Sequence, residues 1–180
     1  MRAFEQIRYD GGRTITLEET LDRMNSAPHP VPRVTIFAIG FGQKSAREFF
    51  ELLRVAGVRK VIDVRLNNVS QLAGFTKKDD LAFFLEQIGG IGYEHRPELA
   101  PTKQMLDDYR SGTVGWDVHE RNLRQLLAER GAENTYDPAT ADGACLLCSE
   151  PAPDRCHRRI VAEYLSGCWG NVEIRHLPLC

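Results

Sequence analysis

The chain has 180 residues, a length typical of one domain with at most a small appendage. Hydrophobic residues make up 42% and charged residues 27%, close to the averages of globular proteins, which excludes a disordered or fibrous chain. With 23 basic and 25 acidic residues the net charge is −2, which excludes a broadly basic nucleic-acid coat but not a local basic pocket.

Residues 1–33 differ in pattern from the rest of the chain and predict a small N-terminal arm. Apolar residues precede the turn Asp10-Gly11-Gly12, and Thr16 with Glu19 forms a capping box that starts a short helix. Alternate prolines at 28, 30 and 32 then favour a stiff, extended linker. We expect an arm of hairpin, helix and linker over 1–33 and a single domain over 34–180.

From Val34 onward the hydrophobic period switches repeatedly between that of a strand and that of a helix. This alternation predicts an α/β fold, a mostly parallel sheet of about five strands with helices on both faces, in a Rossmann-like three-layer arrangement. Ligands of such sheets bind at the carboxyl ends of the strands, which makes strand-end residues the candidates for function. The strands are expected at 34–40, 60–64, 91–94, 143–149 and 172–177, and the helices at 45–56, 76–88, 103–110, 116–130 and 155–166.

No stretch approaches the roughly 20 consecutive apolar residues that a membrane span needs. The first twelve residues also lack the apolar core of a secretory signal. We therefore expect a cytoplasmic protein with no membrane partner, in which cysteines stay reduced. The five cysteines are an odd number, so at least one cannot pair within the chain.

The segment from Cys148 to Arg159 joins the fourth strand to the last helix and carries the strongest functional signal. Asp154 is a suitable N-cap, which would place Cys156 and His157 in the first helical turn, where free amides and the helix dipole favour anions. A thiol in that position ionises more easily than a free one. The pattern indicates an anion-binding corner with reactive thiols, in which Glu150 or His157 moves protons. The alternative is that Cys148 and Cys156 are small buried packing residues.

Metal binding is a further alternative, because Cys145 and Cys148 form a CxxC pair with Cys156 and His157 close behind. Residues three apart on a strand face opposite sides, and the adjacent Cys156 and His157 cannot easily reach one ion. We therefore assign no cofactor and no metal ligand, and keep a structural zinc as the less favoured alternative.

A second candidate group follows the second and third strands. Asp63 and Arg65 share one strand face in a run that otherwise reads as buried, which fits a buried ion pair or a site in which Arg65 grips a phosphate or carboxylate. In the latter case Asp63 orients the ligand or accepts a proton. Ser70 and Tyr93 would line the pocket, and Gly40 would allow close approach of the backbone.

These strand ends form a set. Their order and spacing resemble the bacterial domain-of-unknown-function family 488 over residues 34–178. The motifs that carry this resemblance are Ala-Ile-Gly (38–40), Asp63-Val64-Arg65 with Ser70, Gly92-Tyr93, Cys148-Ser-Glu150 and Cys156-His157-Arg158. The resemblance implies an α/β domain with an active site assembled from these strand ends. It implies no established reaction.

The chain departs from the family pattern at three places. Phe41 and Gly42 stand where members commonly have a histidine and a hydroxyl residue, Asn67 to Val69 replace a usual proline, and Leu99-Ala100-Pro101 replaces Leu-Gly-Gly. If the missing histidine is catalytic in the family, this chain is a binder or has altered chemistry.

The leading hypothesis is an enzyme, a hydrolase or a transferase, acting on a small anionic or phosphate-bearing ligand such as a nucleotide or a nucleic-acid end. The alternatives are a non-catalytic nucleotide- or anion-binding module and a structural zinc protein. A nucleic-acid partner would have to bind through the local patch of Arg155, Arg158 and Arg159. The candidate catalytic residues are Asp63, Cys148, Glu150, Cys156 and His157, and the candidate substrate-binding residues are Gly40, Arg65, Ser70, Tyr93 and Arg158.

Overall fold

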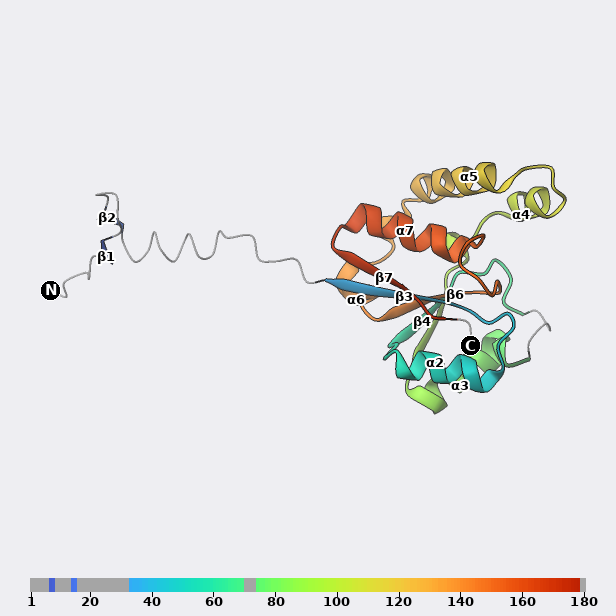
Figure 1. Cartoon of the computed structure of the whole chain (residues 1–180), viewed down its shortest axis with the longest axis horizontal. Helices are drawn as coiled ribbons and strands as arrows, with labels where there is room; N and C mark the ends of the chain where they lie inside the picture. The colour runs from blue at the N-terminus through green and yellow to red at the C-terminus, as the bar shows by residue number, and fades with distance from the viewer. Residues whose placement is uncertain (1–6, 9–13, 16–32, 70–73, 179–180) are drawn as a thin grey trace. The chain divides into compact units, whose positions relative to one another are not determined.

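A five-stranded, all-parallel sheet forms the centre of the larger part of the chain, in the order β5-β4-β6-β3-β7 (Figure 1). The computed structural model describes residues 7–8, 14–15, 33–69 and 74–178. The predicted α/β fold with a parallel sheet is confirmed. The strands are β3 (Val34–Gly40), β4 (Lys60–Asp63), β5 (Gly92–His95), β6 (Ala144–Cys148) and β7 (Val172–His176).

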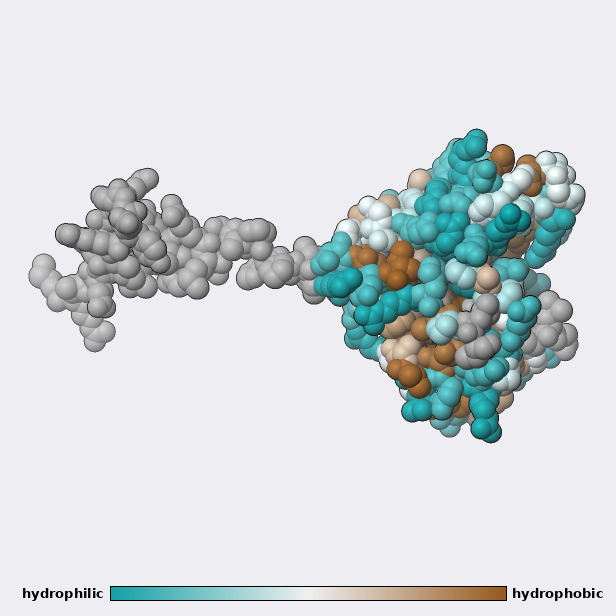
Figure 2. All heavy atoms as spheres, viewed as in Figure 1, coloured by the Kyte–Doolittle hydropathy of each residue, from teal (hydrophilic) through white to brown (hydrophobic). Residues whose placement is uncertain are grey.

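Helices cover both faces of this sheet, with α2 and α3 on one face and α5 and α7 on the other (Figure 1). The coloured part of the face seen in Figure 2 is largely hydrophilic and carries several apolar patches. The helices are α2 (Ala46–Val55), α3 (Lys78–Gly89), α4 (Lys103–Arg110), α5 (Trp116–Glu129), α6 (Pro138–Ala141) and α7 (His157–Trp169), with the 3-10 turns η1 (Gly74–Thr76), η2 (Pro97–Leu99) and η3 (Ala132–Asn134). No helix in the described ranges is long and apolar enough to cross a membrane.

The N-terminal part is described separately, because the chain divides into two compact units after Pro32. Its described residues form two short antiparallel strands, β1 (Ile7–Arg8) and β2 (Thr14–Ile15), with Ile7 opposite Ile15. The predicted helix that starts at Thr16 and the proline linker lie outside the described residues.

Helix α2 begins where the capping box predicts. The Ser45 hydroxyl accepts from the amide of Glu48 at 3.3 Å, and the Glu48 carboxylate accepts from the amide of Ser45 at 2.7 Å. These two bonds satisfy donors that a helix start otherwise leaves unpaired. The helix then buries Phe49, Phe50 and Leu53 against the sheet.

Two predicted helix starts are wrong by a few residues. Helix α3 begins at Lys78, because Thr76 ends the preceding 3-10 turn η1. Helix α7 begins at His157 with Cys156 as its N-cap, although Asp154 was expected to be the cap. The prediction failed at α7 because residues 151–155 form bends and turns that wrap around a buried side chain described below.

Each strand presents alternate side chains to two separate cores. Ile62 of β4 and Leu146 of β6 pack under α5 and α7, whereas Val61 and Leu147 pack under α2 and α3. This alternation follows from the two-residue period of a strand. The strand register then aligns the carboxyl ends, because Gly40 of β3 lies opposite Cys148 and Asp63 of β4 lies opposite Leu147.

Candidate active site

The thiols of Cys148 and Cys156 lie together at the carboxyl edge of the sheet. Their Sγ atoms are 2.7 Å apart, and Nη1 of Arg158 lies 2.7 Å from the sulfur of Cys148 and 3.1 Å from that of Cys156. Cys148 ends the buried strand β6, while Cys156 caps α7 and Arg158 occupies the first turn of that helix. The strand and the helix thus bring two thiols and one guanidinium to a single point.

Arg158 is buried, with 1% of its surface exposed. Its remaining contacts are backbone carbonyls, since Nη1 donates to Glu150 at 2.6 Å and Nη2 donates to Pro151 at 3.3 Å. No ion pair among the described residues includes Arg158, whereas the neighbouring Arg159 is paired with Glu120 and Glu163. A buried guanidinium without an anionic partner is costly, so the thiols are the groups placed to supply the negative charge.

The two thiols differ in how easily they ionise. Burial opposes ionisation of Cys156, but the hydrogen bond from Cys148 and the charge and amide of Arg158 outweigh it and lower the pKa of Cys156. Burial and the neighbouring sulfur raise the pKa of Cys148 well above its usual value. The position of Cys156 at a helix N-terminus favours the same distribution. The pair is therefore best described as a Cys156 thiolate that accepts a hydrogen bond from the Cys148 thiol.

His157 follows Cys156 and is held by the end of β4. Its Nε2 lies 3.0 Å from the carbonyl oxygen of Val64, so Nε2 carries the hydrogen in this bond and Nδ1 has the free lone pair. Burial, together with the charge of Arg158, lowers the pKa of His157 to about 4 and outweighs the opposing effect of the Val64 carbonyl. At neutral pH His157 is therefore uncharged, so it can act as a base but not as a general acid.

Asp63 and Arg65 form the buried ion pair that the sequence left open. The carboxylate of Asp63 accepts from Nε of Arg65 at 2.7 Å and from Nη2 at 2.6 Å, and it also accepts from the hydroxyl of Tyr93 at 2.8 Å. Asp63 is fully buried and Arg65 is 5% exposed. Nη2 of Arg65 also donates to the Thr76 carbonyl at 2.9 Å, so groups of the protein itself hold the guanidinium in place.

Two residues that are not among the candidate site residues, Asn68 and His95, complete the Asp63 cluster. Asn68 donates to the hydroxyl of Tyr93 at 3.0 Å, and Nε2 of His95 lies 2.8 Å from the Arg65 carbonyl. Both residues follow the strand-end rule, because Asn68 lies in the polar loop after β4 and His95 ends β5, the strand that carries Tyr93. Burial and the charge of Asp63 raise the pKa of Tyr93, so this phenol stays protonated.

The predicted site residues thus separate into two clusters on opposite faces of the sheet. Cys148 shares the face of Leu146, under α5 and α7, because the two are two residues apart on β6. Asp63 shares the face of Val61, under α2 and α3, for the same reason. The bond from His157 to the backbone of Val64 links the thiol cluster to the strand that carries Asp63.

The other predicted residues have varied positions. Gly40 lies beside the thiol cluster, where its missing side chain leaves room for the Glu150 carbonyl and for Arg158. The side chain of Glu150 is exposed, and its backbone oxygen is what contacts the cluster. Ser70 lies outside the described residues. Of the predicted basic patch, Arg155 is exposed while Arg158 is buried and Arg159 is ion-paired, so the patch does not present three free cations.

Cys145 is separated from the other two cysteines of the proposed CxxC arrangement. It belongs to the core under α2 and α3, on the face of β6 opposite to Cys148, and burial raises its pKa. Within the ranges that the structure describes, no group of three or more histidine, cysteine or acidic side chains is arranged to hold a metal ion.

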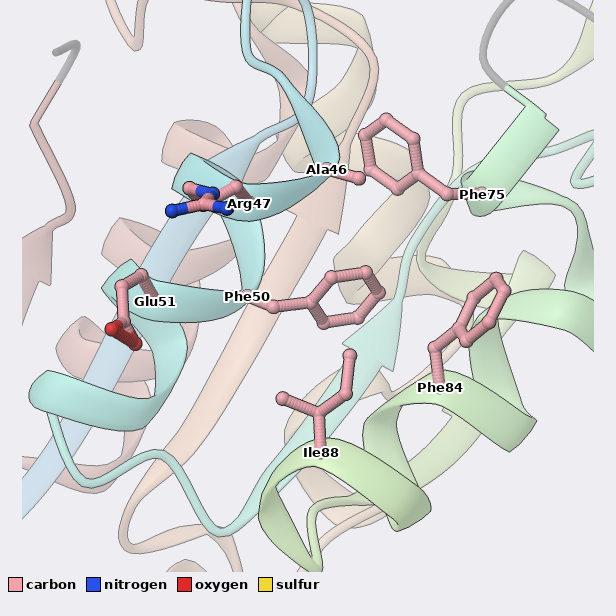
Figure 3. Close-up of a pocket in the computed structure, with 7 residues that line it drawn as sticks. All are labelled: Ala46, Arg47, Phe50, Glu51, Phe75, Phe84 and Ile88. Carbon is pink, nitrogen blue, oxygen red and sulfur yellow. The ribbon is translucent and has the colours of Figure 1, made fainter.

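A pocket of about 470 Å³ opens between α2 and α3, away from the thiols. In Figure 3 the side chains of Phe50, Phe84 and Ile88 face one another across it, while Arg47 and Glu51 point outward from α2. This pocket explains why Ile88, predicted to lie on the buried face of its helix, is 48% exposed. Five of the seven lining residues are apolar and none is a cysteine or histidine, so we take the thiol cluster as the candidate active site.

Comparison with known proteins gives a family but no function. No curated protein and no solved structure matches the chain significantly. One family model, described as "Domain of unknown function DUF488", matches residues 45–165 and so includes Asp63, Cys148, Cys156 and Arg158. Because this match covers more than half of the chain, the protein belongs to the DUF488 family.

Proposed function

We propose that the chain is an enzyme in which the Cys156 thiolate acts as the nucleophile on a small anionic or phosphate-bearing substrate. The observation that supports the proposal is the buried Arg158 guanidinium, which contacts two thiols and has no carboxylate partner among the described residues. A positive charge in this position stabilises a thiolate, and a thiolate is the reactive form of cysteine.

The need for charge balance supports an anionic substrate. When the sulfur of Cys156 forms a covalent bond to a substrate, it loses its negative charge and Arg158 loses its partner. A phosphate or carboxylate on the substrate would restore that partner, because a guanidinium pairs well with either group. A neutral substrate would leave the buried cation uncompensated.

The residues suggest an order of events for hydrolysis. The Cys156 sulfur attacks a carbon or phosphorus atom, and the leaving group departs with the bonding electron pair. Water then attacks the covalent intermediate while Nδ1 of neutral His157 accepts the proton, and Cys156 is released as a thiolate. Transfer to an acceptor other than water would follow the same course.

Access to the thiols limits the size of the substrate. Cys156 is 1% exposed and Cys148 is fully buried. The cover is the segment 149–155, in which Glu150, Asp154 and Arg155 are exposed. A substrate must be small, or this segment must move, as loops over active sites commonly do.

The proposal is tested with chromogenic esters that carry a second anionic group and with para-nitrophenyl phosphate. We expect wild-type protein and Cys168→Ser, a control at an exposed cysteine, to release nitrophenol at equal rates. Cys156→Ser should lose activity by about 10³-fold or more, because the weaker hydroxyl nucleophile remains protonated.

A different pattern would support the binding-module alternative. If phosphate or a nucleotide raised the thermal unfolding temperature of wild type while no substrate was turned over, the enzyme proposal would be wrong. Equal turnover by wild type and Cys156→Ser would likewise remove Cys156 as the nucleophile.

A further inference from the structure

We infer that Cys148 and Cys156 form a peroxide-reactive dithiol that closes reversibly to an intramolecular disulfide. The inference rests on the arrangement of the two sulfur atoms and Arg158. It goes beyond the proposed action on an anionic substrate and does not depend on it.

The geometry distinguishes this pair from the other cysteines of the described chain. The two Sγ atoms are 2.7 Å apart and free, which places each sulfur within reach of the other without rearrangement of the sheet. Cys145 faces the opposite core, and Cys168 is exposed near the far end of α7. Only Cys148 and Cys156, among the four described thiols, contact a cation.

The surroundings also favour one order of reaction. Cys156 caps the N-terminus of α7 and contacts Arg158, so it is the sulfur that attacks, while Cys148 supplies the second thiol. Hydrogen peroxide is close to water in size, which suits a sulfur that is 1% exposed. Glu150 and Pro151 of the segment 149–155 already bind Arg158 through their carbonyls, so the segment and the thiols form one unit.

The chemistry balances with a peroxide as the oxidant. The Cys156 thiolate attacks one peroxide oxygen, the O–O bond breaks, and hydroxide leaves with its electron pair, so that Cys156 becomes a sulfenic acid. The sulfur of Cys148 then attacks the Cys156 sulfur, the S–O bond breaks, and one water forms with the proton of the Cys148 thiol. The hydroxide takes up the proton that Cys156 lost when it ionised and becomes the second water. Two thiols and one hydrogen peroxide thus give one disulfide and two waters. A dithiol reductant reverses the process by exchange.

The first experiment counts thiols in the full-length protein. Reduced protein is treated with hydrogen peroxide, the remaining thiols are blocked with N-ethylmaleimide, and peptides are mapped without reduction. We expect the thiols to fall from five to three per chain, with a single cross-link between the peptides of Cys148 and Cys156, and dithiothreitol to restore all five.

Variants separate the two steps. In Cys148→Ser, Cys156 should be trapped as a sulfenic acid that dimedone labels, with no cross-link. In Cys156→Ser, Cys148 should remain reduced, and Cys168→Ser should behave as wild type at the pair. Because peptide mapping of the wild type needs no substitution, the test does not depend on whether a variant folds.

Several results would overturn the inference. The inference is wrong if peroxide oxidises only the Cys168 thiol, or if cross-links form only between chains. It is also wrong if wild type and Cys156→Ser lose the same number of thiols. This test is also distinct from that of the enzyme proposal. The protein could form the disulfide without turning over any ester, or turn over an ester without forming the disulfide.

Discussion

The carbonyl oxygen of Glu150 occupies the position that a side chain on Gly40 would need. A Cβ atom built on Gly40 would lie 1.7 Å from that oxygen and 2.8 Å from Nη1 of Arg158. The end of β3 therefore packs directly against the segment that covers the thiols. The lack of a side chain at Gly40 makes room for the backbone of Glu150. The sequence had suggested that it makes room for a ligand.

Gly40→Ala should destabilise the fold strongly, because the new Cβ would clash with the backbone of Glu150, which cannot move away as a flexible side chain could. Overpacking usually costs about 1–3 kcal/mol, and a backbone clash of this kind should lie at or above the upper end. Urea unfolding measures the change. Gly167→Ala is the matched control, since a Cβ there meets nothing within 4 Å and lies in a helix. Equal stability of the two variants would contradict this packing.

Arg158→Met should raise the pKa of Cys156 by removing the positive charge that holds its thiolate. The measurement is the pH dependence of alkylation of Cys156 by iodoacetamide, followed by peptide mapping. Cys156 should still react in wild type at a pH at which it no longer reacts in Arg158→Met. Arg155→Met removes one charge from an exposed site and should leave the profile unchanged. A similar shift in both variants would argue against a specific role for Arg158.

Asp63→Asn should cost about 3–5 kcal/mol of stability, because it leaves Arg65 as a buried charge without its partner. It also weakens the acceptor that Tyr93 uses. The free energy of unfolding in urea provides the value. Glu173→Gln, which removes a carboxylate from the more exposed pair with Arg175, should change the stability far less than Asp63→Asn. A small effect at Asp63 would mean that the pair is not structural.

The stability of the protein should fall as the pH drops from 6.5 towards 4, in part because of His157. Its pKa is about 4 in the folded chain against an ordinary value of 6.5, so between these values the unfolded state binds the extra proton. The stabilising contribution is therefore complete above pH 6.5 and is lost on acidification. His157→Gln keeps a donor for the Val64 carbonyl but cannot titrate.

Stability curves of wild type and His157→Gln, measured by urea unfolding across this range, test the assignment. The loss on acidification should be smaller in the variant, and the slopes above pH 7 should agree. Parallel curves at all pH values would show that His157 does not titrate in this way.

Local patterns predicted most of the fold. The capping box at Ser45 and Glu48 set the start of α2, and the apolar run of residues 34–40 matches β3 in full. The convergence of Cys148 and Cys156 also followed from local rules, because a strand end and the helix after it must approach each other in a parallel sheet.

The division of the site into two clusters could not be predicted in this way. The two-residue period of a strand predicted that Asp63 and Arg65 lie on the same face, and likewise Cys148 and Glu150. It did not predict whether these two pairs lie on the same face of the sheet. That depends on the register of Asp63 against Leu147, which is a tertiary property. Arg158 was expected to bind an anionic ligand or to belong to a basic patch. The sequence gives no sign that the carbonyls of Glu150 and Pro151 will enclose its guanidinium.

The contrast between Arg158 and Arg159 has a consequence for how a ligand reaches the protein. One arginine is buried against sulfur and the other is neutralised by Glu120 and Glu163, so neither projects a field into solvent. The exposed charges of the covering segment are two acidic and one basic, at Glu150, Asp154 and Arg155. An approaching anion is therefore not steered from a distance and meets the positive charge only at contact, so association rates should change little with ionic strength.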